Sequence, residues 1–571
     1  MQPITKRSWR PRRGEPGAAQ GISLSGVPPL LAGLLANRGV SDPQAALAYL
    51  NPTLSSLSDP LLLKGMEAAV DRLSLALSRG ERVCVHGDYD VDGVTSSALL
   101  IGFFRAVGID CFSYIPKRLT EGYGLSSHGV TAAAQTGAKV LITVDCGITS
   151  LEEGALCREA GIDLIITDHH APADRLPHAC AIVNPLQPGC AFPFKSLAGV
   201  GVAFHLLIAL RARLRLDGRF TAGEPDIREY LDLVALGTVA DVVPLLGANR
   251  VLVSYGLKQL SCASRVGVQA LKDVAGIAGE VGCGAVGFRL APRINAAGRL
   301  EDAALGLELL LTRDGARAKS IATALDESNA QRQSLERATL EEARAMLEEG
   351  ACRGRKSIVL GSELWHPGVI GIVASRIAEL FHRPVILFAF EGETGRGSGR
   401  SISRFHLLDA IKSCAGHLLR YGGHSHAAGM SIDRDELERF ALSFDEAAAG
   451  TLDADALTPT LAYDLELAPG EIEQSLVLEI DRMKPFGMGN PEPVFLLRGA
   501  SIDEGRVLKG GHLKLKLSCG GRSFDAIGFG LADKGVPTGR VDLLFSPGIN
   551  VWNGKSSLQL IVKDLRGEGA C

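Results

Sequence analysis

The sequence predicts an α/β protein: a parallel-sheet domain, a long connecting helix, a second α/β domain and a C-terminal β-barrel. Three observations lead to this prediction. Short apolar runs alternate with helical patterns between residues 81 and 185, as in parallel sheets with crossover helices. The segment 316–349 contains no proline or glycine and has apolar residues at helical spacing. After residue 457, short strand-like segments and glycine turns dominate.

Composition is that of a soluble globular protein of several domains. The chain has 571 residues, of which 46% are hydrophobic and 22% charged. No apolar run approaches the roughly 18 residues of a membrane span. The twelve cysteines form no Cys-x-x-Cys pair, which favours reduced thiols in a cytoplasm over a disulfide framework or a zinc ribbon. The formal net charge of −4 does not indicate nucleic-acid binding, but a local basic face would still permit it.

The N-terminus is basic and is not followed by the apolar core of a signal peptide. Its charges come from Lys6, Arg7, Arg10, Arg12 and Arg13. We expect a disordered tail, with a contact to nucleic acid as the alternative.

The segment 82–93 carries the clearest chemical signal. An apolar run is followed by His86, Asp88, Asp90 and Asp92 at every second position. Alternate side chains of an extended chain share one face, and carboxylates held so close repel one another unless they share a cation. Oxygen ligands with one imidazole favour Mn²⁺ or Mg²⁺. Strict alternation would let all three acids bind metal, a turn beginning at Asp90 would not, and a solvated acidic turn is the alternative.

Other expected strand ends carry similar side chains. Asp145 follows the run 140–144, and Asp168, His169 and His170 follow the run 163–167. A fourth acid, Asp241, follows the apolar run 233–240. Ligands of parallel sheets bind at the carboxyl ends of the strands, so we expect all of these at one sheet edge. Taken singly, Asp145 could cap a helix, the triplet could form a turn, and Asp241 could pair with an arginine. The five expected strands are 83–85, 112–115, 140–144, 164–166 and 181–183.

Four segments resemble the motifs of the DHH phosphoesterases, a family that includes RecJ exonucleases, small phosphodiesterases and one class of inorganic pyrophosphatases. They are His-Gly-Asp-Tyr-Asp-Val-Asp-Gly, Val-Asp-Cys-Gly-Ile, Asp-His-His and Gly-Thr-Val-Ala-Asp. The resemblance implies two divalent metal ions, Mn²⁺ or Mg²⁺, with Asp145 as a bridge. His170 is then expected to touch substrate phosphate, and Asp168 to orient a ligating imidazole. The implied ligands are His86, Asp88, Asp90, Asp92, Asp145, His169 and Asp241, and the implied catalytic residues are Asp145, Asp168, His169 and His170.

Three further segments of the first half of the chain carry weaker signals. The segment 116–125 follows a strand and carries charges and an aromatic residue, and 197–204 is a small-residue helix start that we expect to serve packing. The segment 289–299 resembles an arginine-bearing loop of RecJ, with Gly298 to bend it. Arginines and an asparagine there suit phosphate binding, and a salt-bridged surface loop is the alternative. The candidate nucleic-acid contacts in it are Arg293, Asn295 and Arg299.

The segment 316–349 predicts one helix of about 50 Å that ties two domains together, with coiled-coil dimerisation as the alternative. Strands at 357–360 and 384–390 around a helix at 369–381 predict a second α/β domain. The glycine-rich segments 395–401 and 422–429 suit close approach to a phosphate chain, and they resemble the DHHA1 companion domain. Candidate nucleic-acid contacts are Ser375, Arg376, Arg400, His424 and His426; a stray metal pair of the two histidines is the alternative.

The C-terminal strands fit an OB-type barrel, which binds single strands through a basic groove and aromatic platforms. Lys514, Lys516 and Trp552 are candidates there, and ordinary strand-face residues are the alternative. The segment 485–491 resembles a RecJ linker motif. Expected domains are 1–55 (tail and lead-in), 56–312 (DHH), 313–350 (connecting helix), 351–455 (DHHA1) and 456–571 (OB-type).

Motif order, long helix and barrel together resemble RecJ more than the small DHH enzymes. The resemblance implies a 5′-to-3′ exonuclease of single-stranded DNA in recombination and repair, with a cleft between the α/β domains too narrow for duplex. It also implies single-strand binding protein and a helicase as partners; we expect a cytoplasmic monomer without membrane contact. The alternatives are a phosphodiesterase of short oligonucleotides or cyclic dinucleotides, and a non-catalytic single-strand binder.

Overall fold

The computed structural model describes residues 7–117, 121–122, 124–220, 223–300, 302–537, 539–552 and 554–568. Its contacts divide the chain into two compact units. One unit holds residues 51–331 and 484–491, and the other holds residues 1–50, 332–483 and 492–571. Each unit is described by itself.

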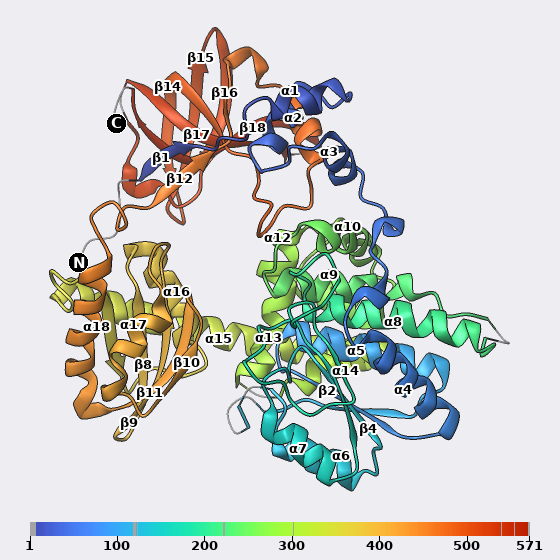
Figure 1. Ribbon diagram of the computed structural model, residues 1–571. Coiled ribbons are helices and arrows are strands. Elements are labelled where there is room, and N and C mark those ends of the chain that lie inside the picture. Colours follow the sequence, from blue (N-terminus) through green and yellow to red (C-terminus); the bar gives the residue numbers. More distant parts are fainter. Residues whose placement is uncertain are drawn as a thin grey trace. The chain divides into compact units, whose positions relative to one another are not determined.

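The unit that holds residues 51–331 is built on a five-stranded parallel sheet with the strand order β3-β2-β4-β5-β6. Alternate residues of its strands enter two separate cores, one shared with the helices within residues 66–107 and 199–240, the other with the helices within residues 127–159. These helices are labelled around the sheet in Figure 1. The five strands confirm the predicted parallel sheet. They are β2 (Val83–Gly87), β3 (Cys111–Tyr114), β4 (Val140–Val144), β5 (Asp163–Thr167) and β6 (Ala181–Val183).

Helices account for most of the remainder of this unit. They are α4 (Met66–Arg79), α5 (Val91–Val107), α6 (Ser127–Gln135), α7 (Leu151–Glu159), α8 (Gly199–Leu216), α9 (Leu231–Ala240), α10 (Gly247–Cys262), α11 (Val266–Val274), α13 (Ala291–Leu300) and α14 (Ala304–Leu311). The run before Asp241 is the buried helix α9, so this acid follows a helix and not a strand. The apolar run was ambiguous because a buried helix is apolar all round.

The segment 289–299 is helical, which corrects the expected loop. A π-helical turn, Val286–Leu290, leads directly into α13. Gly298 serves close packing: a Cβ there would lie 2.7 Å from the carbonyl oxygen of Tyr89. The segment 116–125 falls partly outside the described residues, because Arg118, Leu119, Thr120 and Tyr123 are not among them.

A single helix, α15 (Gly315–Glu349), runs from one unit into the other. Its 35 residues span about 52 Å at about 1.5 Å per residue, as predicted. The helix confirms the expected connection between two domains.

The second α/β domain has a five-stranded sheet with the order β10-β11-β9-β8-β7. Strands β7 (Ile358–Ser362) and β8 (Val385–Glu391) are parallel and flank α16 (Ile370–Phe381), as predicted. The glycine-rich segments are strands and not loops: β9 (Thr394–Arg400), β10 (Arg420–Gly423) and β11 (Ala427–Asp433). Gly395 and Gly397 are required there because a Cβ at either would meet a phenylalanine ring at 2.4–2.7 Å. The helices α17 (Leu407–Ser413) and α18 (Leu437–Thr451) complete the domain.

The C-terminal strands close into the predicted barrel, with β14 pairing both β15 and β17. The strands are β12 (Thr460–Tyr463), β13 (Leu465–Glu466), β14 (Phe495–Leu508), β15 (His512–Cys519), β16 (Arg522–Gly528), β17 (Arg540–Trp552) and β18 (Lys555–Gly567), with α19 (Gln474–Asp481) between β13 and β14. Trp552 lies on β17, but its side chain is outside the described residues.

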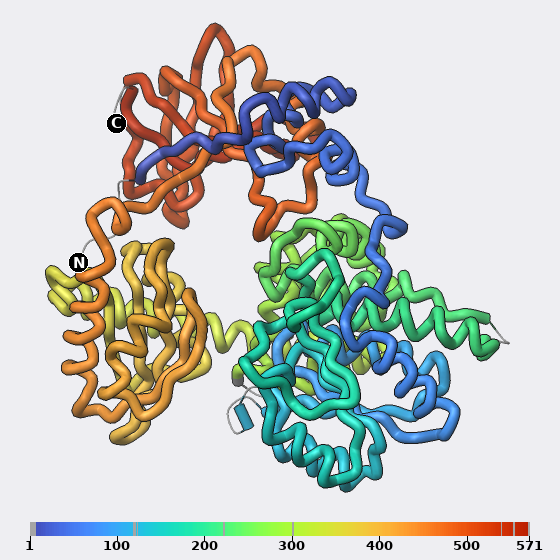
Figure 2. Tube along the Cα trace, viewed as in Figure 1, coloured from blue at the N-terminus to red at the C-terminus, as the bar shows by residue number. Residues whose placement is uncertain are grey.

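The N-terminal segment is ordered from residue 7, so the expectation of a disordered basic tail is wrong for residues 7–13. Strand β1 (Ser8–Pro11) pairs in parallel with β12, and the blue N-terminal trace lies beside the orange C-terminal one (Figure 2). Trp9 Nε1 donates to Asp564 Oδ2 at 2.8 Å, and Arg566 stacks over the Trp9 ring. Apolar and ionic contacts therefore hold a segment whose composition alone suggested disorder. Three helices follow: α1 (Ala18–Leu24), α2 (Pro29–Ala36) and α3 (Pro43–Leu50).

Among the described residues, no helix is long and apolar enough to cross a membrane. The described cysteines are all free, in agreement with the expected reduced thiols.

Candidate metal centre and nucleic-acid contacts

The acids after β2 do not alternate along one strand. The strand ends at Gly87, and Asp90 caps the N-terminus of α5 by accepting hydrogen bonds from the backbone N–H groups of Asp92 (2.9 Å) and Gly93 (3.1 Å). Of the two geometries left open by the sequence, the structure has the turn at Asp90. Asp92 consequently lies in the first helical turn and points away from the strand face.

Asp92 is held by the start of a different helix. Its carboxylate accepts hydrogen bonds from the backbone N–H groups of Gly199 (2.6 Å) and Val200 (2.9 Å) at the N-terminus of α8. Free N–H groups at a helix N-terminus stabilise an anion. The small-residue segment 197–204 therefore serves the site, although the sequence suggested only packing. The signal that could have found it is the run of small residues at a helix start, which lets the backbone approach closely.

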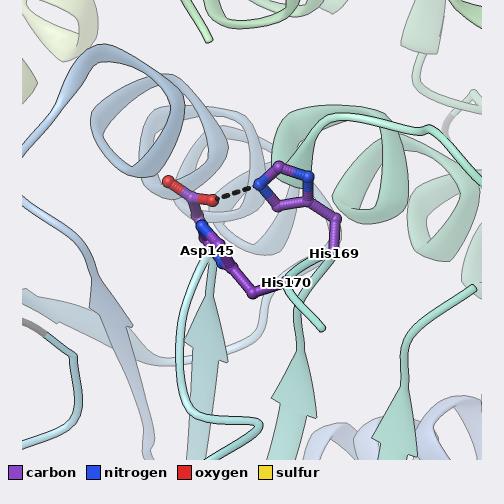
Figure 3. A group of neighbouring side chains, drawn as sticks. All are labelled: Asp145, His169 and His170. Atoms are coloured by element: carbon purple, nitrogen blue, oxygen red, sulfur yellow. Dashed lines mark ion pairs between the residues drawn. The ribbon is translucent and has the colours of Figure 1, made fainter. Parts of the chain in front are cut away.

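Asp145 follows β4 in a left-handed backbone conformation, with φ of 61°. Such a conformation is uncommon for residues other than glycine, and residues held in it cluster at functional sites. It brings Asp145 Oδ1 to 3.0 Å from His169 Nε2, from the loop after β5 (Figure 3). His169 Nε2 also lies 3.6 Å from Asp241 Oδ2 and 3.9 Å from Asp92 Oδ2. Three acids from three segments thus surround one imidazole nitrogen.

Three groups of ligand atoms lie within metal-binding reach, the atoms of each within 4.8 Å of one another. They are Asp88, Asp90 and Asp145; Asp92, His169 and Asp241; and Asp145, His169 and His170. The first two groups share no residue, and the third joins them. The structure therefore collects six of the seven expected ligands, together with His170, at the carboxyl ends of β2, β4 and β5. Asp88, Asp90 and Asp92 are all among them, so the expectation that a turn at Asp90 would exclude one of the three acids is wrong.

His86 is in none of these groups. It is fully buried, its ring stacks on Tyr114 with centroids 5.3 Å apart, and its Nδ1 lies 4.0 Å from Cys146 Sγ. Its Nε2 lies beside Gly129, where a Cβ would come within 2.7 Å of it. His86 Nε2 is buried and makes no hydrogen bond within the described chain, and the expected role of His86 as a ligand stays a prediction.

The cluster is electrostatically incomplete without cations. Burial, followed by the repulsion of neighbouring carboxylates, raises the pKa of Asp145 well above its ordinary value and that of Asp241 to about 9. The same causes raise the pKa of Asp92 to about 7. Burial lowers the pKa of His169 to about 4, so its imidazole is neutral, which is the form that binds metal. His169 Nε2 and Asp241 Oδ2 are buried and make no hydrogen bond within the described chain. Hard oxygen ligands and a neutral imidazole with unused lone pairs fit Mn²⁺ or Mg²⁺.

Asp168 orients the loop after β5. Its Oδ1 lies 2.7 Å from His170 Nδ1 and accepts from the backbone N–H of His169 (2.7 Å), while its Oδ2 accepts from Ile148 N (2.9 Å). Burial alone would raise the pKa of Asp168, but the hydrogen bond and charge of His170 outweigh it and lower this pKa. Burial likewise opposes protonation of His170, but Asp168 raises its pKa overall. Asp168 thus orients the ring of His170 and favours its protonated form.

Candidate residues on the arginine-bearing helix α13 make contacts within the protein. Arg293 Nη2 pairs with Asp326 Oδ1 at 2.8 Å, and Asn295 Oδ1 accepts a hydrogen bond from Val91 N (3.1 Å) at the start of α5. Arg299 is half-buried on the same helix. Asn295 therefore supports the segment that carries the acids, a role that the sequence did not suggest.

Family models match three parts of the chain: the DHH family, N-terminal domain, at 82–238; the DHHA1 domain at 354–450; and the RecJ OB domain at 463–564. The chain is 40% identical over 561 residues to the single-stranded-DNA-specific exonuclease RecJ of Escherichia coli K12, covering 94% of this chain and 96% of that protein. The chain belongs to the RecJ family. To the RecJ of Bacillus subtilis 168 it is 37% identical over 546 residues, covering 94% of this chain and 68% of that protein.

Solved RecJ structures are similar along most of the chain. A crystal structure of RecJ from Thermus thermophilus in complex with Mn²⁺ has a TM-score of 0.85 at 36% identity, covering 99% of this chain and 81% of that one. A second, of exonuclease RecJ bound to manganese, has a TM-score of 0.61 at 42% identity, covering 70% of this chain and 97% of that one. The same RecJ of Thermus thermophilus has also been crystallised with Mg²⁺. The metals in these structures are those that the donor set of the present site suits.

The candidates of the DHHA1 domain differ in how tightly they are held. Arg400 on β9 donates to Ser398 Oγ (3.2 Å) and to Gly399 O (2.7 Å), and Ser375 Oγ donates to Gly371 O (3.2 Å) within α16. His424 and His426 are both exposed after β10. Arg400 lies on the strand β9 and Arg376 on the helix α16. Regular elements hold a side chain in place better than a loop does.

The two barrel lysines have different neighbours on the outer face of β15. Lys516 is paired across the sheet with Glu504 and Asp525, whereas Lys514 is paired with Arg506 and Ile527. Most of these side chains line a cavity of about 350 Å³. Opposite charges on both sides offset Lys516, and no acid lies directly opposite Lys514.

Proposed function

We propose that this chain hydrolyses single-stranded DNA processively from the 5′ end with two divalent metal ions, in recombination and repair. The observation that carries the proposal is the pair of ligand groups that share no residue, Asp88, Asp90 and Asp145 beside Asp92, His169 and Asp241. Two sites this close suit an in-line displacement at phosphorus. The RecJ names of the relatives supply the substrate class.

Each side chain has a defined task in this mechanism. Asp88, Asp90 and Asp145 would hold one ion and Asp92, His169 and Asp241 the other. Gly199 and Val200 keep Asp92 in place through their N–H groups. Mn²⁺ or Mg²⁺, when bound, lowers the pKa of a coordinated water and polarises the scissile phosphate. His170, held by Asp168, would donate a hydrogen bond to a phosphate oxygen. Arg376 and Arg400, with His424 and His426, would bind the DNA strand.

The test is digestion of 5′- and 3′-labelled single- and double-stranded DNA, with short oligonucleotides and a cyclic dinucleotide in parallel. With Mn²⁺ we expect loss of the 5′ label from single strands, and no cleavage with chelator or in Asp145→Ala. A preference for dinucleotides, or activity that survives deletion of 456–571, would instead indicate an oligonucleotide phosphodiesterase. The narrow cleft, monomeric state and association with single-strand binding protein or a helicase stay predictions.

A further inference from the structure

One buried carboxylate holds two arginines in the DHHA1-containing unit. Glu336, on α15, has a side chain only 2% exposed, and its Oε2 accepts from Arg332 Nη1 at 2.6 Å, one helical turn earlier. Its other oxygen, Oε1, lies 2.6 Å from Nη2 of Arg376 on α16. A buried carboxylate is costly unless it is paired, and here it has two cations.

The two arginines differ in exposure and in how they contact Glu336. The Arg332 side chain is 9% exposed and is hydrogen-bonded, so it cannot serve an external ligand. The Arg376 side chain is 54% exposed. Its contact with Glu336 is an ion pair without hydrogen-bond geometry. Charge therefore holds the guanidinium in place while its exposed N–H donors stay available to an acceptor from outside.

The helix that carries Arg376 is itself fixed on α15. Glu342, six residues beyond Glu336, accepts from Ser362 Oγ (2.8 Å) and Trp365 Nε1 (2.9 Å), in the segment between β7 and α16. Apolar side chains of α15 and α16, among them Ala343 and Ile377, share one core. The connecting helix α15 thus contacts this part of the domain through the carboxylates of Glu336 and Glu342 and through apolar side chains.

The charge balance explains why three groups are present rather than two. A lone Arg376–Glu336 pair would be neutral and would attract a phosphate weakly. With Arg332 the cluster carries a net charge of +1, and the excess charge lies at the one exposed member of the three. A positioned, singly charged guanidinium is suited to bidentate binding of a phosphate oxygen pair.

We propose that Glu336 and Arg332 are positioning residues for DNA binding: together they hold Arg376 in place and leave the three-residue cluster with a net positive charge. The inference rests on the proposed function, because Arg376 is taken there as a contact to the strand. It adds that the connecting helix, and not only the DHHA1 domain, sets the affinity for single-stranded DNA.

The test is a variant that removes the buried pair without changing the charge. Glu336→Gln with Arg332→Met leaves Arg376 alone, so the cluster stays at +1, and apolar replacement of a buried pair is often tolerated by a fold. Ordering a free arginine on binding costs affinity, so we expect KM for oligo(dT) to rise about three- to tenfold with kcat unchanged. The salt dependence of Kd, measured with chelator, keeps the native slope, whereas Arg376→Ala lowers it by about 0.7.

A matched control removes an exposed ion pair of the same domain without changing net charge. Arg355 Nη2 and Glu438 Oε1 lie 2.7 Å apart, and Arg355→Met with Glu438→Gln is expected to keep the native KM. In an Arg376→Ala background, the Glu336/Arg332 change is expected to add nothing. An equal rise of KM in both backgrounds, or none in the native one, overturns the inference.

A second variant keeps the test decisive if the double variant does not fold. Arg332→Met alone leaves Glu336 paired with Arg376 and makes the cluster neutral, so affinity and salt slope should both fall although Arg332 cannot reach a strand. Native affinity in this variant refutes the charge argument. Failure of the proposed function is distinguishable, because the native chain with Mn²⁺ would then leave single-stranded DNA intact.

Discussion

Gly199 offers the sharpest perturbation of the metal centre, because it places no side chain in the site yet lies against two of its acids. A Cβ at this position would lie 2.8 Å from Asp145 Cβ, 2.9 Å from Asp145 Oδ1 and 3.0 Å from Asp92 Oδ2. Ordinary contact begins near 3.4 Å. Gly199→Ala therefore requires the two carboxylates to move by about 0.4–0.6 Å, and it strains the 2.6 Å hydrogen bond from Gly199 N to Asp92.

Displacements of this size are large for catalysis, since a misplacement of about 1 Å can cost about a hundredfold in rate. We expect kcat/KM for single-stranded DNA with Mn²⁺ to fall about 30- to 100-fold, or about 2–2.7 kcal/mol. Alanine is the better helix former by about 0.5–1 kcal/mol, so thermal stability should change little. Loss of activity without loss of stability is the expected signature.

The matched control is Gly201→Ala, two residues further along α8. A Cβ there would meet only Leu197 Cδ2 at 3.3 Å, with Leu197 Cβ at 3.7 Å and Asn249 Oδ1 at 3.9 Å. Both variants are assayed for cleavage and, by calorimetry, for Mn²⁺ affinity. If Gly199→Ala cleaves as fast as Gly201→Ala at saturating Mn²⁺, the close packing of the acids is not what catalysis needs.

Three further predictions concern charge. Asp241 has a pKa of about 9 and Asp92 one of about 7, so both bind protons near neutral pH. Mn²⁺ binding should therefore release protons. Calorimetry in buffers of different ionisation enthalpy should show this proton release, which should fade above pH 9. Asp241→Asn removes a buried acid that favours the neutral form, so we expect a higher melting temperature without metal and a smaller rise with Mn²⁺; a lower metal-free value would contradict this. Lys514→Ala should weaken oligo(dT) binding and reduce its salt slope by about 0.7, whereas Lys516→Ala, offset by Glu504 and Asp525, should change neither; equal effects would refute the distinction.

Much of the fold follows from local pattern. The strands of the parallel sheet are continuous apolar runs because both faces are buried, and polar side chains directly after them had to gather at one edge. Asp145, His169 and His170 were found in this way. The long helix was equally plain, since nothing between residues 316 and 349 breaks it.

Other parts of the site depend on contacts between segments far apart in sequence. The run before Asp241 is apolar whether it forms a strand or a buried helix, so its periodicity could not separate the two. The glycines of β9 suggested a loop, but they are set by phenylalanine rings on β8 that fill the space above them. Arg293 has its partner, Asp326, 33 residues away on α15, and no local signal distinguishes such an arginine from one that binds phosphate.

The hydrogen-bond donors around the buried carboxylates are unevenly distributed. This explains why the site requires cations for function although the protein can fold without them. Asp168 receives three backbone N–H groups together with the His170 ring, so the fold itself offsets its charge. Asp92 receives two backbone N–H groups but keeps a raised pKa of about 7. Asp145 and Asp241 have still higher pKa values, because burial and neighbouring carboxylates disfavour their charged forms. Without metal, these acids bind protons, which removes the unfavourable buried charge and keeps the site folded. The protonated acids lack the negative charge that binds a metal ion. Cation binding then exchanges protons for metal within a prebuilt frame, so activity should depend on metal and pH far more steeply than stability does.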